Sequence, residues 1–216
     1  MIIKSKDISE KAVSLIESSI KKLLEKQKHV VLGVPGGRSA EAIFKKIKKK
    51  NITWNKVHFF MVDERCVPMS NKESNFRILK RNLISSVKPP QGNVHSFNYK
   101  KNIASYTKEL KKYGGKFDII LLSSGEDGHV AALFPFYTIE DESEYFIILD
   151  KSPKPPLKRM SASRKLLEKS KIAILLFSGK EKELAFKMFN DEKISVNGCP
   201  AKLVNKIKEN YVITNL

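Results

Sequence analysis

Apolar residues recur along the chain in two alternating patterns, one typical of helices and the other of buried strands. Asp7 stands at an N-cap position with Glu10 three residues later, and apolar residues then follow at helical spacing up to about Gln27. Continuous apolar runs such as 30–34 and 117–122 are typical of strands that a parallel sheet buries on both faces. The same reasoning predicts further strands at 57–62, 94–97, 145–149, 172–177 and 211–214, and helices near 42–47, 75–87, 103–113, 164–169, 181–190 and 201–207.

This alternation favours an α/β fold with a mainly parallel sheet and helices on both of its faces. A length of 216 residues suits one domain, so 1–216 is predicted to be a single unit, with the proline-rich stretch 153–156 as a rigid loop inside it. In open α/β sheets, ligands bind beyond the carboxyl ends of the strands. The polar, glycine-containing segments that follow Val34, Val62, Leu122 and Phe177 are therefore expected to meet at one site.

The first of these segments, Gly36-Gly37-Arg38-Ser39, lies between a predicted strand and a predicted helix. Glycine lets the backbone approach a ligand closely, and the amides of a helix N-terminus favour an anion, so the segment is a candidate phosphate site. An ordinary strand-to-helix turn with a capping serine is the alternative. The pattern is neither a Walker loop nor a dinucleotide fingerprint, because the further glycine and the Gly-Lys-Ser/Thr element of those motifs are missing.

Two further segments carry groups suited to acid–base chemistry. Asp63-Glu64-Arg65 directly follows a predicted buried strand, where a salt-bridged surface turn is the alternative. Asp127-Gly128-His129 follows the most apolar strand, and its glycines permit a tight turn that would present the imidazole to the crevice. An imidazole can take a proton from water while a nearby carboxylate fixes its tautomer. No metal site is predicted, since no second histidine or cysteine stands at ligand spacing from His129.

Charge is the unusual feature of the composition, with 41 lysines and arginines against 23 acidic residues and a net charge of +18. Such a balance favours anionic partners, including phosphorylated metabolites, nucleic acid and membrane surfaces. The lysines are spread over the whole chain, whereas nucleic-acid-binding proteins more often gather them on one element with aromatic residues between them. We interpret most of the charge as solvated surface and keep nucleic-acid binding as a minority alternative. Arg159 and Lys182 are candidates for binding a phosphate dianion.

Nothing in the sequence suggests secretion or a membrane. Residues 1–7 lack the apolar stretch of a signal peptide, and the longest apolar runs are too short to cross a bilayer. Cys66 and Cys199 are the only cysteines and are expected to be reduced thiols. These features lead us to expect a cytoplasmic protein.

Taken in order, the segments from about 30 to 203 resemble the 6-phosphogluconolactonase family, within the glucosamine/galactosamine-6-phosphate isomerase superfamily. The most specific piece is Gly125-Glu126-Asp127-Gly128-His129-Val130-Ala131-Ala132-Leu133-Phe134-Pro135. The other matching pieces are Gly36-Gly37, Trp54, Asp63-Glu64-Arg65-Cys66-Val67-Pro68, Ser74-Asn75, Lys154-Pro155-Pro156, Arg159-Met160-Ser161-Ala162-Ser163, Gly179 to Lys182 and Pro200-Ala201.

The resemblance implies a three-layer αβα, Rossmann-like fold and hydrolysis of 6-phosphogluconolactone to 6-phosphogluconate in the oxidative pentose phosphate pathway. It implies no cofactor, no metal, and a small sugar-phosphate lactone as the partner, with no obligatory nucleic acid or membrane and a monomer favoured. By position, His129 is the general base, with Asp127 and Asp63 orienting it and the sugar hydroxyls. Substrate contacts are expected from Arg65, Glu64, Gly128 and Asn75, and phosphate contacts from Gly36, Gly37, Arg38, Ser39, Arg159 and Lys182.

The chain departs from the family pattern at two places. The family usually has Ser-Gly-Gly-Ser-Thr where this chain has Pro35-Gly36-Gly37-Arg38-Ser39, and it usually has glycine where Ser123 stands. The nearest alternative is glucosamine-6-phosphate deaminase, which has the same fold and a similar Asp-Gly-His turn. That enzyme is expected to continue toward Asn-Glu-Pro and to have tyrosine in place of Arg65, and both positions favour the lactonase. A catalytically inactive relative is disfavoured because His129, Asp127, Arg65 and Lys182 are all present.

Overall fold

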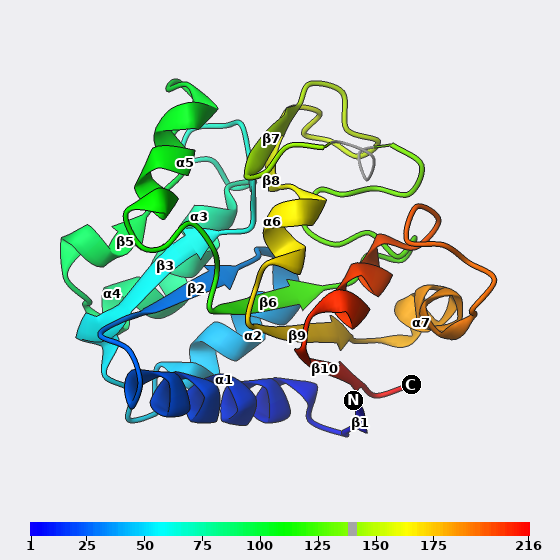
Figure 1. The fold of residues 1–216 in the computed structure, drawn as a ribbon, viewed down its shortest axis with the longest axis horizontal. Helices are drawn as coiled ribbons and strands as arrows, with labels where there is room; N and C mark the ends of the chain where they lie inside the picture. Colours follow the sequence, from blue (N-terminus) through cyan, green and yellow to red (C-terminus); the bar gives the residue numbers. More distant parts are fainter. Residues whose placement is uncertain (138–141) are drawn as a thin grey trace.

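The computed structural model describes residues 1–137 and 142–216, and its largest feature is a parallel sheet of seven strands (Figure 1). The strand order is β1-β10-β9-β6-β2-β3-β5, and every neighbouring pair is parallel. The strands are β1 (Ile2–Lys4), β2 (Val30–Val34), β3 (Val57–Met61), β5 (Val94–His95), β6 (Ile119–Ser123), β9 (Ile172–Phe177) and β10 (Glu209–Thr214). The α/β fold with a mainly parallel sheet is thus confirmed.

Helices cover both faces of this sheet and make it the middle of three layers (Figure 1). On one face α1 (Ile8–Leu24) packs against α2 (Gly37–Ile47), and on the other α6 (Arg164–Glu168) packs against η5 (Pro200–Lys206). Helix α1 begins where it was predicted to begin, with Asp7 as its N-cap. The Asp7 carboxylate accepts a hydrogen bond from the Glu10 amide at 2.9 Å. The other helical segments are η1 (Trp54–Lys56), α3 (Asn75–Leu79), η2 (Lys80–Ile84), α4 (Ser85–Val87), η3 (Gln91–Asn93), α5 (Ile103–Lys111), η4 (Lys180–Lys182) and α7 (Glu183–Asn190).

A second, antiparallel sheet corrects the prediction for 145–149. It has the order β4-β8-β7, built from β4 (Asp63–Arg65), β8 (Arg159–Ala162) and β7 (Phe146–Leu149). We expected 145–149 in the parallel sheet, but β7 pairs with β8 in antiparallel register. Three of its four residues are buried and only Ile148 is exposed, so its apolar pattern resembles that of a parallel strand buried on both faces. Strands β4 and β8 were not predicted because polar and charged residues interrupt their apolar pattern. A smaller correction concerns 201–207, which forms the 3₁₀ helix η5 and not an α-helix.

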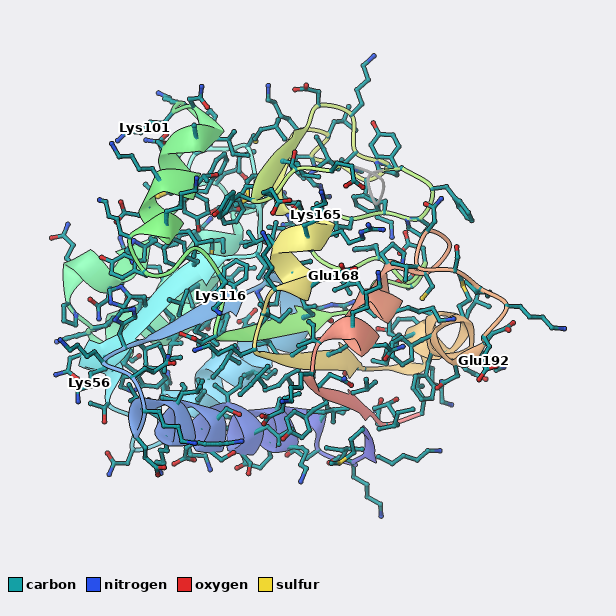
Figure 2. All side chains as sticks on the ribbon, in the orientation of Figure 1. Lys56, Lys101, Lys116, Lys165, Glu168 and Glu192 are labelled. Carbon is teal, nitrogen blue, oxygen red and sulfur yellow. The ribbon has the colours of Figure 1, made fainter. Side chains whose placement is uncertain are left out.

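Positive charge is distributed over the surface, as expected. Lys56, Lys101, Lys116 and Lys165, for example, lie on different segments of the fold (Figure 2). Several lysines pair with nearby carboxylates, for example Lys46 with Asp7 at 2.6 Å. In the described ranges, no helix is both long enough and apolar enough to cross a bilayer.

Three histidines form a cluster at the amino ends of β2 and β3 and in the edge strand β5. The Nδ1 of His58 and the Nε2 of His95 lie 3.0 Å apart, and the ring of His29 lies 5.2 Å from that of His58. Burial and the neighbouring imidazoles lower the pKa of His58 to about 4 and that of His95 to about 4, although the Glu109 carboxylate opposes this. Both rings are therefore neutral in the folded protein near neutral pH.

The histidine cluster predicts that stability falls as the pH drops from about 6.5 to about 4. In this window the unfolded chain binds protons at His58 and His95 that the folded chain does not, so the unfolded state is favoured, by on the order of 3 kcal/mol for each ring. Urea denaturation at a series of pH values measures this loss. The variant His95→Gln is expected to be less stable at pH 7 but to lose less stability on acidification. Equal losses in the two proteins would contradict this assignment.

Candidate active site

The carboxyl ends of β2, β3, β6 and β9 meet at one open cavity of about 470 Å³. All four polar segments expected to form one site contribute to its wall. Of the predicted site residues, those that line it are His129, Asp63, Arg65, Asn75, Gly36, Gly37, Arg38, Ser39, Arg159 and Lys182. Asp127, Glu64 and Gly128 are outside its wall. The wall also includes Ile8 and Ser9 at the start of α1, which no pattern in the sequence connects with the other segments.

His129 and Asp127 form a close pair beside the cavity. The Nδ1 of His129 lies 2.5 Å from Asp127 Oδ1, so Nε2 is the ring nitrogen left to accept a proton from a ligand or water. Asp127 supports the ring from outside the cavity wall, and its Oδ2 lies 3.2 Å from the Nζ of Lys154. Partial burial opposes ionisation of Asp127, but the hydrogen bond with His129 and the charges of His129 and Lys154 outweigh it and hold the pKa of this carboxyl well below its usual range.

Two glycines make this tight pair possible. A Cβ at Gly125 would lie 2.0 Å from His129 Nδ1 and 2.6 Å from Asp127 Oδ1, so any side chain there would displace the pair. Gly128 has φ of 81°, a left-handed conformation that favours glycine. A Cβ at Gly128 would lie 2.8 Å from the Sγ of Cys199. Gly128 thus packs against buried Cys199, a position that favours a role in shaping the turn over the predicted contact with substrate.

Glu64 is buried at the start of α3 and does not face the cavity. Its carboxylate accepts hydrogen bonds from the backbone amides of Arg65, Asn75 and Phe76 at 2.7, 2.8 and 2.7 Å, and from the Ser74 hydroxyl at 3.1 Å. Burial raises the pKa of Glu64 despite these bonds. The position favours a role in fixing α3 against β4, where we had predicted contact with substrate.

Two neighbouring residues of the cavity wall, Asn75 and Arg65, each have a buried polar atom without a hydrogen-bond partner among the described residues. Asn75 donates from Nδ2 to Asp63 Oδ2 at 2.9 Å, and its carboxamide packs against Gly36, where a Cβ would lie 1.9 Å from Asn75 Oδ1. Arg65 donates from Nη1 to the Glu73 carbonyl at 2.7 Å. Both Asn75 Oδ1 and Arg65 Nε are buried without a hydrogen-bond partner among the described residues. Both atoms are also shielded from solvent, so in this conformation neither is presented to a ligand in the cavity.

The cavity wall combines several features that favour an anion. This helix has Gly36 as its N-cap with no side-chain hydrogen bond to its first-turn amides, so these amides are available to an anion. Four cationic side chains line the cavity, those of Arg38, Arg65, Arg159 and Lys182, against the carboxylates of Asp63 and Glu181. The side chain of Lys182 is only 17% exposed, and its Nζ lies 3.8 Å from Glu126 Oε1. The first-turn amides of α2 and these cations suit the cavity to a phosphate group.

The guanidinium of Arg159 is hydrogen-bonded to backbone carbonyls of the loop that precedes it. The residue is 5% exposed, and it donates from Nε to the Pro156 carbonyl at 3.1 Å and from Nη2 to the carbonyls of Lys154 and Pro155 at 3.0 Å each. Burial and the charge of Arg65 lower the pKa of Arg159. These three bonds anchor the loop through Nε and Nη2, while the guanidinium also lines the cavity, so the phosphate contact of Arg159 stays a prediction.

The fold and the cavity define the class of protein: an α/β enzyme with an aspartate–histidine pair and an anion-binding region at the carboxyl ends of its parallel strands. Residues 4–213 match the family described as glucosamine-6-phosphate isomerases/6-phosphogluconolactonase, and the chain belongs to this family.

Individual relatives agree with this assignment. The chain is 36% identical over 208 residues to a 6-phosphogluconolactonase of Borreliella burgdorferi, covering 89% of this chain and 86% of the relative. It is 33% identical over 174 residues to that of Thermotoga maritima, covering 79% of each. The crystal structure of a 6-phosphogluconolactonase from Thermotoga maritima superimposes with a TM-score of 0.88 at 30% identity, covering 99% of this chain and 98% of that one.

Proposed function

We propose that this protein hydrolyses 6-phosphogluconolactone to 6-phosphogluconate, a step of the oxidative pentose phosphate pathway. The observation that carries the proposal is the pairing of His129 with Asp127 on a cavity that also holds the start of α2 and Lys182. Relatives named 6-phosphogluconolactonase support it. We further propose, as the sequence led us to expect, that residues 1–216 act as one domain and as a monomer, in the cytoplasm and without a cofactor.

In the proposed reaction, water attacks the lactone carbonyl carbon while His129 Nε2 takes its proton. Asp127 fixes the imidazole tautomer and stabilises the imidazolium that forms. The carbonyl oxygen becomes an oxyanion, and the Arg65 guanidinium, which lines the cavity, is the candidate to stabilise it. The bond between the carbonyl carbon and the ring oxygen then breaks, and the proton on Nε2 can pass to the departing oxygen. The products are a carboxylate and a hydroxyl group.

The phosphate, remote from the reacting bond, would serve to hold the ring in place. We assign it to the first-turn amides of α2 with Arg38, Ser39 and Lys182. Arg38 stands where the family usually has serine, so this chain would replace a hydroxyl donor by a charged one. Fixing the ring at this end lets water and His129 meet the carbonyl carbon in a near-attack geometry.

Replacing Lys182 with alanine is expected to raise KM by about 10- to 100-fold with little change in kcat, because the phosphate is bound alike in the ground and transition states. Steady-state kinetics on the lactone measures both constants. Lys180→Ala is the matched control, since Lys180 is exposed on the same short helix and does not line the cavity. A fall in kcat with unchanged KM would contradict the assignment of Lys182.

Assays of the purified protein on 6-phosphogluconolactone and on glucosamine 6-phosphate, side by side, test the proposed function. We expect lactone opening faster than the spontaneous reaction and no release of ammonia. Ammonia release without lactone hydrolysis would show that the deaminase alternative is the correct one.

A further inference from the structure

A continuous series of contacts connects the loop at 152–159 with His129. Lys154 Nζ lies 3.2 Å from Asp127 Oδ2, and the other oxygen of the same carboxylate, Oδ1, lies 2.5 Å from His129 Nδ1. Asp127 is therefore shared between a lysine and the histidine. In the sequence, Lys154 belongs only to a proline-rich motif. It stands 27 positions after Asp127, and no local spacing relates the two residues.

We propose that Lys154 is a positioning residue that sets the proton affinity of His129 through Asp127, and that Arg159 holds Lys154 in place for this purpose. The inference rests on the proposed function, because it gives Lys154 and Arg159 their roles in the use of His129 as a base.

The electrostatic reason is the competition of two cations for one carboxylate. An aspartate paired only with a histidine stabilises the imidazolium and raises the pH at which the ring loses its proton. A lysine on the second oxygen neutralises part of the carboxylate charge and so weakens this stabilisation. It also restrains the plane of the carboxylate, and with it the orientation of the imidazole. A general base must be neutral to act, so the lysine extends the active range of His129 toward lower pH.

The anchoring of the loop explains how an exposed lysine can do this. The side chain of Lys154 is 45% exposed, and an ion pair on a freely moving lysine at such a place contributes little. The backbone of the loop that carries Lys154 is, however, held by hydrogen bonds. Arg159 binds the carbonyls of 154, 155 and 156, and the buried Ser152 hydroxyl donates to the Lys154 carbonyl at 2.7 Å and the Pro156 carbonyl at 3.2 Å. The backbone of Lys154 is therefore held in place, which limits the positions that its side chain can take near Asp127.

Other charged groups around His129 are arranged differently. The centroid of the Phe134 ring lies 4.6 Å from that of the His129 imidazole. The Arg159 guanidinium lies 5.6 Å from the centroid of the Phe134 ring, on which it packs. Lys182 is nearest to Glu126, at 3.8 Å, and Cys199 lies behind Gly128. Asp63, Arg65, Arg38 and Glu181 share the cavity wall with His129. Within the described ranges, Lys154 is the one lysine or arginine in an ion pair with Asp127.

The test compares Lys154→Gln, which removes the charge, with Lys154→Arg, which keeps it. Lys151→Gln is the control, since it removes an exposed lysine from the same loop. NMR titration of the His129 imidazole, without substrate, measures its pKa directly, and the pH profile of kcat/KM measures the same group in turnover. For Lys154→Gln we expect the His129 pKa and the acidic limb of the profile to rise by about 0.5 to 1 pH unit. Activity on that limb would fall by about 3- to 10-fold, while the plateau at higher pH is kept.

Lys154→Arg and Lys151→Gln are expected to titrate like the wild type. An unchanged or lowered His129 pKa in Lys154→Gln would overturn the proposal, and so would a rise of equal size in Lys151→Gln. The NMR readout needs no catalysis. If the wild-type protein failed to open the lactone, the proposed function would fall, while the imidazole titration would still decide whether Lys154 controls His129.

Discussion

Replacing His129 with alanine is expected to lower kcat by about 10³-fold, since a positioned general base contributes roughly 10²- to 10⁴-fold. The imidazole is the group beside the cavity that can take a proton from water near neutral pH, and its Nδ1 is already held by Asp127. The residue lies at the cavity rather than in the apolar core, so the protein is expected to remain folded. The measurement is kcat on the lactone after subtraction of spontaneous opening, with a thermal melt to confirm the fold.

His29→Gln provides the control for the loss of a histidine, because His29 belongs to the cluster with His58 and does not line the cavity. It is expected to keep the wild-type kcat. Turnover close to normal in His129→Ala would show that another group activates the water, and the assignment of the base would have to be abandoned.

Replacing Gly125 with alanine is expected to lower kcat by about 10²-fold, because misplacement of a catalytic group by about 1 Å can cost this much. The added Cβ would lie 2.0 Å from His129 Nδ1 and 2.6 Å from Asp127 Oδ1, so the pair must move apart or shift together. Gly125 does not have a positive φ, so the backbone itself can accept alanine. The steric effect of the added Cβ is therefore expected to displace Asp127 and His129. Steady-state kinetics on the lactone measures the loss.

Gly92→Ala is the matched substitution, since a Cβ at Gly92 meets nothing within 4 Å and its φ is not positive. It is expected to change neither kcat nor stability by a measurable amount. Wild-type kcat in Gly125→Ala would mean that the spacing of Asp127 and His129 tolerates displacement, contrary to the geometry of the site.

The location of the site was predictable because parallel strands deliver their carboxyl ends to one edge of the sheet. Four polar segments, each directly behind an apolar run, could therefore be placed together without knowledge of their contacts. The pairing of Asp127 with His129 was predictable for a local reason, since two residues and an intervening glycine form one tight turn. Long-range contacts had no such signal, and the ion pair between Lys154 and Asp127 is an example.

Burial explains where the sequence was misleading. Glu64 has the position and chemistry of a site residue, but three backbone amides and a hydroxyl converge on its carboxylate and turn it toward the start of α3. Arg159 lines the cavity as expected, and burial also lets it donate three hydrogen bonds to carbonyls of its own loop, which the sequence did not reveal. The antiparallel sheet was missed because β4 and β8 consist largely of polar residues, whose pairing depends on partners far away in the sequence.

The most direct test of the proposed activity is the initial rate of 6-phosphogluconolactone opening as the concentration of purified protein is varied, with the spontaneous rate subtracted. The structure of the site predicts a rate that rises in proportion to the protein and falls by about 10³-fold when His129 is replaced by alanine. A rate equal to the spontaneous one at every concentration of the wild-type protein would contradict the account.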